Sequence, residues 1–174
     1  ICRAIQSVLN QIRQPDEIII VDDGSTDQTG ELIRQYESQV KYIHQQNAGG
    51  SQARNTGIRA AESDWIAFLD ADDEWLPEKL LLQEKLHQRN PDLVWSYTNY
   101  LVRNEDSNSE DRLSLPRQNA FTLLDGKEYF DDYFTAYAQD LPTHTISLMI
   151  NKEILYEVGM FLPGQPWAQD ADLA

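Results

Sequence analysis

IIIVDDGS, residues 18–25, decides the fold class, because a run of β-branched residues predicts a fully buried strand that ends in two carboxylates. WIAFLDADD, residues 65–73, repeats this arrangement, with acidic side chains directly after an apolar run. Open α/β sheets bind their ligands beyond the carboxyl ends of the strands. Two acidic turns of this kind, with a helical segment between them, predict a site that handles a metal ion and a nucleotide.

Helices and strands are predicted to alternate along the chain. The hydrophobic pattern predicts helices over 1–12, 25–36, 51–61, 77–89 and 151–158, and strands over 18–21, 40–44, 65–69, 92–97 and 146–150. Ser25 is expected to begin a capping box for the second helix. Residues 103–119 are predicted to form a solvated loop or insertion, and 126–138 a further helix. The alternation predicts an α/β fold with a mostly parallel central sheet flanked by helices.

The composition limits the classes of partner. The chain has 174 residues, enough for one domain with a substantial core, and a formal net charge of −15. Binding to nucleic acid relies on clustered Lys and Arg, so this charge argues against a nucleic-acid partner. The acidic side chains serve solubility, and some of them are expected to hold a divalent cation. Cys2 is the single cysteine, and no run of about 18 apolar residues predicts a membrane span.

The two acidic turns resemble the Val-Asp-Asp-Gly-Ser and Asp-x-Asp motifs of family 2 glycosyltransferases, which have the GT-A fold. Other segments also resemble that family and follow in its order. The matching segments are DEIIIVDDGSTD (16–27), NAGG (47–50), ARNTG (53–57), FLDADD (68–73), WLPEKL (75–80), VGMF (158–161) and QDADL (169–173). The resemblance covers nearly the whole chain, and it implies a Rossmann-like nucleotide-diphospho-sugar transferase fold.

The family has a strand before its first helix, whereas this sequence opens within that helix at Ile1. In the GT-A fold this strand lies inside the sheet, and without it two strand edges would be exposed. The resemblance therefore implies that 1–174 is a single GT-A domain, incomplete at both ends, within a longer protein. We expect the first strand to precede Ile1 and an acceptor-side segment to follow Ala174.

The resemblance implies a divalent metal at the second acidic turn. Asp72 matches the last Asp of the Asp-x-Asp motif and is the expected ligand of Mn²⁺ or Mg²⁺, cations that prefer carboxylate oxygens. Asp70 matches the first Asp, which is expected to contact the ribose or the water shell of the metal, and Asp73 has no assigned role. The alternative is an acidic turn that leads into the helix near Trp75.

The first acidic turn and the following helix are expected to bind the nucleotide sugar. By resemblance, Asp23 accepts a hydrogen bond from the base, as a carboxylate does from the N3–H of uracil, and Asp22 contacts the donor or orients the turn. Arg54 matches a basic residue near the donor pyrophosphate, and its position near a helix start suits anion binding. The alternatives are a tight turn closed by Gly24 and a solvent-facing Arg54.

Asp170 is the expected general base by resemblance, because it matches the second acid of an acidic pair in the family. A single base of this kind implies direct displacement with inversion at the anomeric carbon. Gln169 and Ala171 depart from the family pattern, and Asp172 is the rival base. A solvated acidic turn is the alternative for the whole segment. His144, Trp95 and Trp167 are expected to be structural.

The resemblance implies an inverting, metal-dependent glycosyltransferase that uses a nucleotide diphosphate sugar, with uridine as the expected nucleoside. Its acceptor would be a hydroxyl of a saccharide, a lipid-linked glycan or a protein, in the synthesis of a cell-surface polysaccharide or another glycan. We expect a cytoplasmic location, in solution or at the inner face of the membrane. The oligomeric state stays open, a homo-oligomer included. The alternatives are a non-catalytic nucleotide-sugar-binding module, a degenerate transferase and a nucleotidyltransferase.

Overall fold

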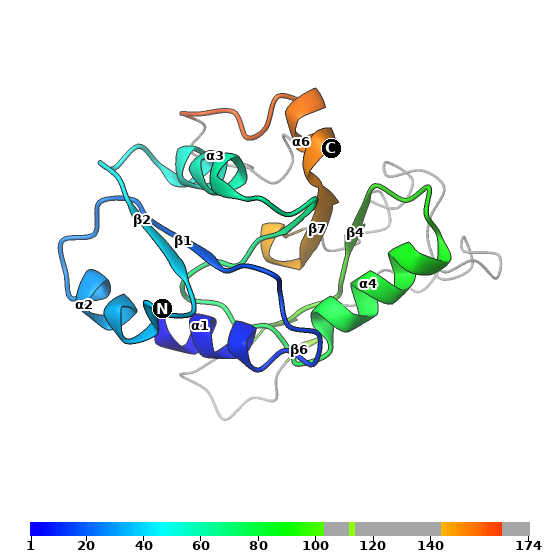
Figure 1. Cartoon of the computed structure of the whole chain (residues 1–174), viewed down its shortest axis with the longest axis horizontal. Coiled ribbons are helices and arrows are strands. Elements are labelled where there is room, and N and C mark those ends of the chain that lie inside the picture. The colour runs from blue at the N-terminus through cyan, green and yellow to red at the C-terminus, as the bar shows by residue number, and fades with distance from the viewer. Residues whose placement is uncertain (103–111, 114–143, 165–174) are drawn as a thin grey trace.

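A computed structural model describes residues 1–102, 112–113 and 144–164 (Figure 1). Helices and strands alternate through the first half of the chain, as the hydrophobic pattern predicts. The elements are α1 (Cys2–Leu9), β1 (Ile19–Asp22), α2 (Thr29–Ile33), η1 (Arg34–Tyr36), β2 (Lys41–His44), α3 (Gly50–Ala60), β3 (Trp65–Ala67), α4 (Lys79–Arg89), β4 (Trp95–Tyr97), β5 (Leu101–Val102), β6 (Arg112–Leu113), η3 (Thr145–Ser147), β7 (Leu148–Asn151) and α6 (Lys152–Glu157). None of the helices in the described ranges is both long and apolar enough to cross a membrane.

The start of the second helix differs from the prediction. α2 begins at Thr29, and the side chain of its N-cap residue, Gln28, makes no capping hydrogen bond; the Thr29 N–H instead donates to Asp27 Oδ1 at 2.9 Å. The backbone N–H of Ser25 instead donates to Asp22 Oδ1 at 2.8 Å. The predicted capping box at Ser25 is therefore wrong, because the carboxylate of Asp22 organises this turn and delays the helix.

Two further predictions concern the region after β4. Arg112–Leu113, predicted as part of a loop, forms the short strand β6 and pairs antiparallel with β5. Hydrogen bonds between the two strands thus replace solvation for this part of the segment. The helix predicted over 126–138 lies outside the described residues.

Of the ladders in the described residues, the one between β1 and β2 is parallel and the others are antiparallel. β1 pairs in parallel with β2, with Ile19 opposite Lys41 and Asp22 opposite His44. β7 lies between β3 and β4 and pairs antiparallel with both, so β3 and β4 run in the same direction. In Figure 1, β1 and β2 run between α3 on one side and α1 and α2 on the other. This is an α/β arrangement in which the strands have helices on both sides.

The main core lies where α3, β7 and α6 meet. It consists of Ile58, Phe68, Leu148, Ile150, Leu155 and Phe161. The rings of Phe68 and Phe161 meet edge to face, with centroids 5.3 Å apart. Asn55, buried on α3, donates to the Phe161 carbonyl at 2.7 Å and accepts from the Phe161 N–H at 3.0 Å. These two hydrogen bonds fix α3 against the segment that follows α6.

A cavity of about 660 Å³ lies between β1 and β3 and is lined largely by apolar side chains of both strands, α1 and α3. In the described part of the chain, β1 and β3 each have a strand partner on one side only. The carbonyls of Ile18 and Asp22 accept hydrogen bonds from β2 and the residue after it. The backbone groups of the alternate residues, Ile19 and Val21, therefore face the other edge of β1, beside the cavity.

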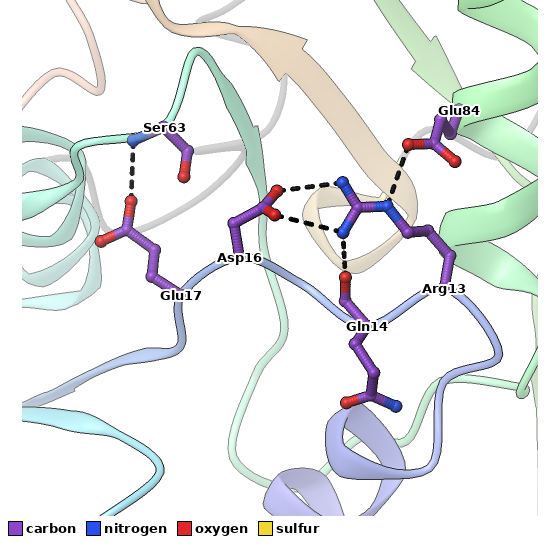
Figure 2. A network of polar contacts seen from close by, with 6 residues as sticks. All are labelled: Arg13, Gln14, Asp16, Glu17, Ser63 and Glu84. Carbon is purple, nitrogen blue, oxygen red and sulfur yellow. Dashed lines mark hydrogen bonds and ion pairs between the residues drawn. The ribbon is translucent and has the colours of Figure 1, made fainter.

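Polar contacts fix the segment that leads into β1 (Figure 2). Arg13 donates to Asp16 at 3.0 Å and to Glu84 of α4 at 2.9 Å. Glu17 accepts from the backbone N–H of Ser63, just ahead of β3, at 2.8 Å. Burial opposes the ionisation of Glu17, but the hydrogen bonds from this backbone outweigh it and lower its pKa. These contacts fix the N-terminal ends of β1 and β3, whereas the two acidic turns follow the C-terminal ends of the same strands.

Candidate functional site

Asp22 ends β1 and is buried, with its side chain 3% exposed. Its Oδ1 accepts from the Ser25 N–H at 2.8 Å, and its Oδ2 accepts from the Tyr42 hydroxyl at 2.6 Å and lies 3.4 Å from Nδ1 of His44. Burial opposes ionisation of Asp22, but the hydrogen bonds from Tyr42, Ser25 and His44 outweigh it and lower the pKa to about 2. Both carboxylate oxygens are therefore engaged within the protein, in the turn and in β2.

Asp23 points toward the loop that follows β2. Its Oδ1 accepts from Gln45 Nε2 at 2.7 Å and from the Ala48 N–H at 2.9 Å, and its Oδ2 accepts from the Gly49 N–H at 2.8 Å. Burial opposes ionisation, but these three hydrogen bonds outweigh it and lower the pKa of Asp23. The charged carboxylate thus fixes the loop that leads into α3.

Gly24 lets the first acidic turn approach that loop closely. It has a φ of +80°, and a Cβ at this position would lie 2.8 Å from the backbone nitrogen of Asn47. A side chain would therefore meet both backbone strain and a steric clash. The tight turn predicted at Gly24 is therefore confirmed, and the contact of Asp23 with a nucleotide base stays a prediction.

Gln45 belongs to the site, although the sequence patterns did not single it out. Its amide nitrogen donates to Asp23, and its Oε1 accepts from the Thr56 hydroxyl on α3 at 2.7 Å. One available signal was its position: Gln45 directly follows β2, as Asp23 directly follows β1, and parallel strands end at the same edge of a sheet. Thr56 carried no such signal, because its role depends on how α3 packs.

Arg54 and Asp70 form an ion pair between α3 and the segment after β3. Arg54 Nη2 lies 2.9 Å from Asp70 Oδ1, and the side chains are 17% and 45% exposed. The guanidinium of Arg54 also lies 5.5 Å from the ring centroid of Phe161. The solvent-facing alternative for Arg54 is therefore wrong: the side chain is largely buried and is paired with another predicted site residue.

The second acidic turn concentrates negative charge. Asp70 and Asp73 are half-buried and Asp72 is exposed. Burial raises the pKa of Asp73, and the charges of Asp72 and Asp70 raise it further, while His144 lowers it. His144 is exposed and meets the ring of Tyr100 edge to face, with centroids 4.6 Å apart. A carboxylate such as that of Asp73, whose ionisation is disfavoured by neighbouring carboxylates, stands in a cluster of negative charge that suits a divalent cation.

The fit of a metal ion depends on this carboxylate set. Over 1–102, 112–113 and 144–164, no three His, Cys, Asp or Glu side chains are already arranged around a metal position. The exposed oxygens of Asp72 and the charge of Asp73 and Asp70 suit a hard cation that takes its other ligands from phosphate and water. The residue types present therefore fit a hard cation such as Mn²⁺ or Mg²⁺ that is bound together with a phosphate ligand.

Asp170, Gln169, Asp172 and Trp167 are outside the described residues. Trp95, on β4, meets Tyr97 edge to face, with centroids 5.4 Å apart.

Residues 1–158 match the family model described as glycosyl transferase family 2. Among curated relatives, an uncharacterized glycosyltransferase of Rickettsia conorii is 43% identical over 104 residues, which make up 59% of this chain and 17% of the relative. TuaG of Bacillus subtilis, named as a putative teichuronic acid biosynthesis glycosyltransferase, is 37% identical over 113 residues, or 62% of this chain and 44% of TuaG. The chain thus spans less than half the length of either relative.

Two solved structures have the same fold at low sequence identity. Staphylococcus aureus TarS 1-349 in complex with UDP superposes with a TM-score of 0.64 at 18% identity, covering 98% of this chain and 48% of that one. The mannosyltransferase PcManGT of Pyrobaculum calidifontis, in complex with GDP-Man and Mn²⁺, superposes with a TM-score of 0.65 at 17% identity, covering 97% of this chain and 45% of that one.

Proposed function

Because the chain belongs to glycosyl transferase family 2 and has the GT-A fold, we propose that it transfers a sugar, with inversion, from a UDP-sugar to a hydroxyl acceptor. The observation that carries the proposal is that α3 joins the two acidic turns. Its N-cap residue, Gly49, donates to Asp23, and Arg54 on the same helix pairs with Asp70. Residues from both turns thereby meet at one helix N-terminus, where backbone N–H groups and the helix dipole favour an anion.

In this proposal the two acidic turns contact different parts of the donor. Asp23 accepts a hydrogen bond from the base, and Arg54 faces the anionic side of the donor. Asp70, held by Arg54, contacts the ribose or the water shell of the metal. Asp22 orients the first turn and makes no contact with the donor, since its side chain is only 3% exposed, whereas Asp23 is half-buried.

We propose Asp72 as the ligand of Mn²⁺ or Mg²⁺. When bound, such a cation neutralises the charge that develops on the leaving diphosphate. The exposed position of Asp72, beside the half-buried Asp73 and Asp70, supports this assignment.

Asp170 is proposed as the general base that takes the proton of the acceptor hydroxyl. Its assignment rests on the resemblance of 169–173 to the family motif. In the Asp170→Asn variant we expect transfer to be lost while donor affinity is retained. Full activity in this variant would refute the assignment.

The acceptor and the setting are proposed from the relatives. The name of TuaG refers to teichuronic acid biosynthesis, and we propose a related role in assembling a cell-surface polysaccharide or another glycan. A cytoplasmic location, at or near the inner face of the membrane, agrees with the use of a nucleotide sugar.

A further strand is proposed between β1 and β3, as the resemblance implies. Its support is the apolar cavity of about 660 Å³ and the unpaired edge of each strand in the described residues. Hydrogen exchange provides a test. The amides of Ile19 and Val21 should exchange rapidly in the 174-residue chain and slowly in a longer protein that includes this strand. Equal exchange in the two proteins would contradict the additional strand.

The experiment that tests the function combines binding and turnover. Calorimetry with a UDP-sugar should give a measurable affinity that rises with Mn²⁺ and falls in Asp72→Asn, with Asp64→Asn as an exposed control. Hydrolysis or transfer of the donor, assayed on the same samples, separates an enzyme from a binding module. Binding without turnover under any condition would favour the non-catalytic alternative, and absence of binding would refute the proposal.

A further inference from the structure

We propose that Gln45 is a positioning residue for base recognition, held by Thr56, and that this pair makes the site select bases with a ring N–H beside a carbonyl, such as uracil, over cytosine. The proposal rests on the proposed function, because it assumes that Asp23 contacts the base of a nucleotide donor.

Gln45 is held at both ends of its amide. Its Nε2 donates to Asp23 Oδ1 at 2.7 Å, and its Oε1 accepts from Thr56 Oγ1, also at 2.7 Å. Its backbone N–H donates to the carbonyl of Asp22 at 2.9 Å, which fixes the start of the side chain beside the first acidic turn. Gln45 and Thr56 are both half-buried. The amide thus has a defined orientation, with its donor end toward Asp23.

The orientation of the amide determines what Asp23 can offer a ligand. Oδ1 already accepts two hydrogen bonds, from Gln45 and Ala48, whereas Oδ2 accepts one, from Gly49. A carboxylate has about four acceptor positions, two on each oxygen. The remaining acceptor capacity is therefore on Oδ2, which suits a single ring N–H.

Gln45 also adds a donor beside that acceptor. Its NH₂ group carries two hydrogens, and one of them serves Asp23. The second is available in chemical terms to a base carbonyl next to the ring N–H. Uracil presents this pair at N3–H and an adjacent carbonyl. Cytosine presents a bare ring nitrogen to Asp23 instead, so that two acceptors would face each other.

Thr56 fixes the orientation of the Gln45 amide, which could otherwise rotate and exchange the positions of its oxygen and nitrogen. With its oxygen satisfied by the Thr56 hydroxyl, Gln45 directs its nitrogen toward Asp23. Without that hydroxyl, Oε1 loses its partner in a half-buried position and the side chain can rotate toward water. Thr56 is on α3 and Gln45 follows β2, so the position of the helix determines the orientation of the Gln45 amide, and through it the hydrogen bonds offered to the base.

The test is calorimetry with UDP and CDP on the purified protein and on matched variants. Loss of one hydrogen bond to a charged group should weaken UDP binding about 10-fold in Gln45→Met and Thr56→Val. CDP binding should change little, so the preference for UDP over CDP falls. Thr56→Ser keeps the hydroxyl and should keep the wild-type preference for UDP over CDP. Thr29→Val serves as a control for removing a threonine hydroxyl elsewhere.

The outcomes separate the two levels of the proposal. If the wild-type protein binds no UDP, the proposed function fails. If it binds UDP and both variants keep the wild-type preference for UDP over CDP, the assignment of Gln45 and Thr56 is overturned alone. Preference for CDP over UDP in the wild-type protein would overturn the selection of bases with a ring N–H beside a carbonyl. Melting temperatures identify a variant that fails to fold, and the other variant then decides the outcome.

Discussion

The Asp22→Asn substitution separates a carboxylate that supports the fold from one that binds the donor. The pKa of Asp22 is lowered from its ordinary value of 3.8 to about 2, and its side chain is 3% exposed, so solvent screening is small. At 1.36 kcal/mol for each pKa unit, this difference corresponds to about 2 kcal/mol of stability at pH 7. We expect Asp22→Asn to lower the free energy of unfolding by roughly this amount.

The sign of the pH dependence follows from the lowered pKa. The contribution is fully present above the ordinary pKa of 3.8 and disappears as the pH falls through about 2. Between pH 7 and pH 3 the wild-type protein should lose about 1 kcal/mol from this group, and Asp22→Asn should lose none of it. Urea unfolding at several pH values measures the difference.

Donor binding provides the second readout for this substitution. UDP affinity should change less than about threefold in Asp22→Asn, because this side chain is buried, but should fall about 10-fold or more in Asp23→Asn, where the half-buried carboxylate is proposed to contact the base. Exposed Asp64→Asn should affect neither stability nor binding. If Asp22→Asn abolished UDP binding without a loss of stability, the assignment of Asp22 to the fold would be refuted.

Three further substitutions test the packing around the site. Gly24→Ala should lower stability by about 1–2 kcal/mol, measured by urea unfolding, and weaken UDP binding, because of the positive φ and the contact with Asn47; unchanged binding would contradict the close approach. Asn55→Ala should cost about 2–4 kcal/mol, since it leaves two buried backbone groups of Phe161 unpaired; a thermal unfolding curve close to the wild type would be incompatible with this. Burial lowers the pKa of Lys79 to about 7, so between pH 7 and 10.5 the unfolded state binds more protons than the folded one, and the free energy of unfolding should rise with pH. Lys79→Met should remove this rise. Denaturant titrations at pH 7 and 9 measure it, and an equal change in the free energy of unfolding for the wild type and Lys79→Met would contradict the assignment.

The sequence predicts those parts of the fold that depend on local signals. The β-branched run before Asp22 and the apolar run before Asp70 form strands as predicted. The prediction that these runs are buried is wrong for the described residues, because the apolar side chains of β1 and β3 line the cavity and are half-buried. The alternation of elements likewise predicts the parallel pairing of β1 and β2. The antiparallel insertion of β7 between β3 and β4 has no local signal, because it joins segments about 50 or more residues apart.

Local competition explains the error at Ser25. Ser, Asp and Gln in the right order predict a capping box, but that prediction treats the helix start in isolation. Here the Ser25 N–H is already taken by Asp22, whose carboxylate is held by Tyr42 of β2. A contact between neighbouring strands therefore decides where a helix begins, and only the packed structure reveals it.

The Arg54–Asp70 ion pair is a contact between two motifs that neither motif predicts alone. The resemblance assigns both residues to the donor, but separately, and their contact depends on how α3 packs against the end of β3. The pair offsets one negative charge of a turn that holds three carboxylates, at Asp70, Asp72 and Asp73. About two negative charges then remain beside a diphosphate that is itself anionic, and such like charges repel one another. A divalent cation on Asp72 would offset that repulsion, and this charge balance is the physical reason for expecting donor affinity to depend on Mn²⁺ or Mg²⁺.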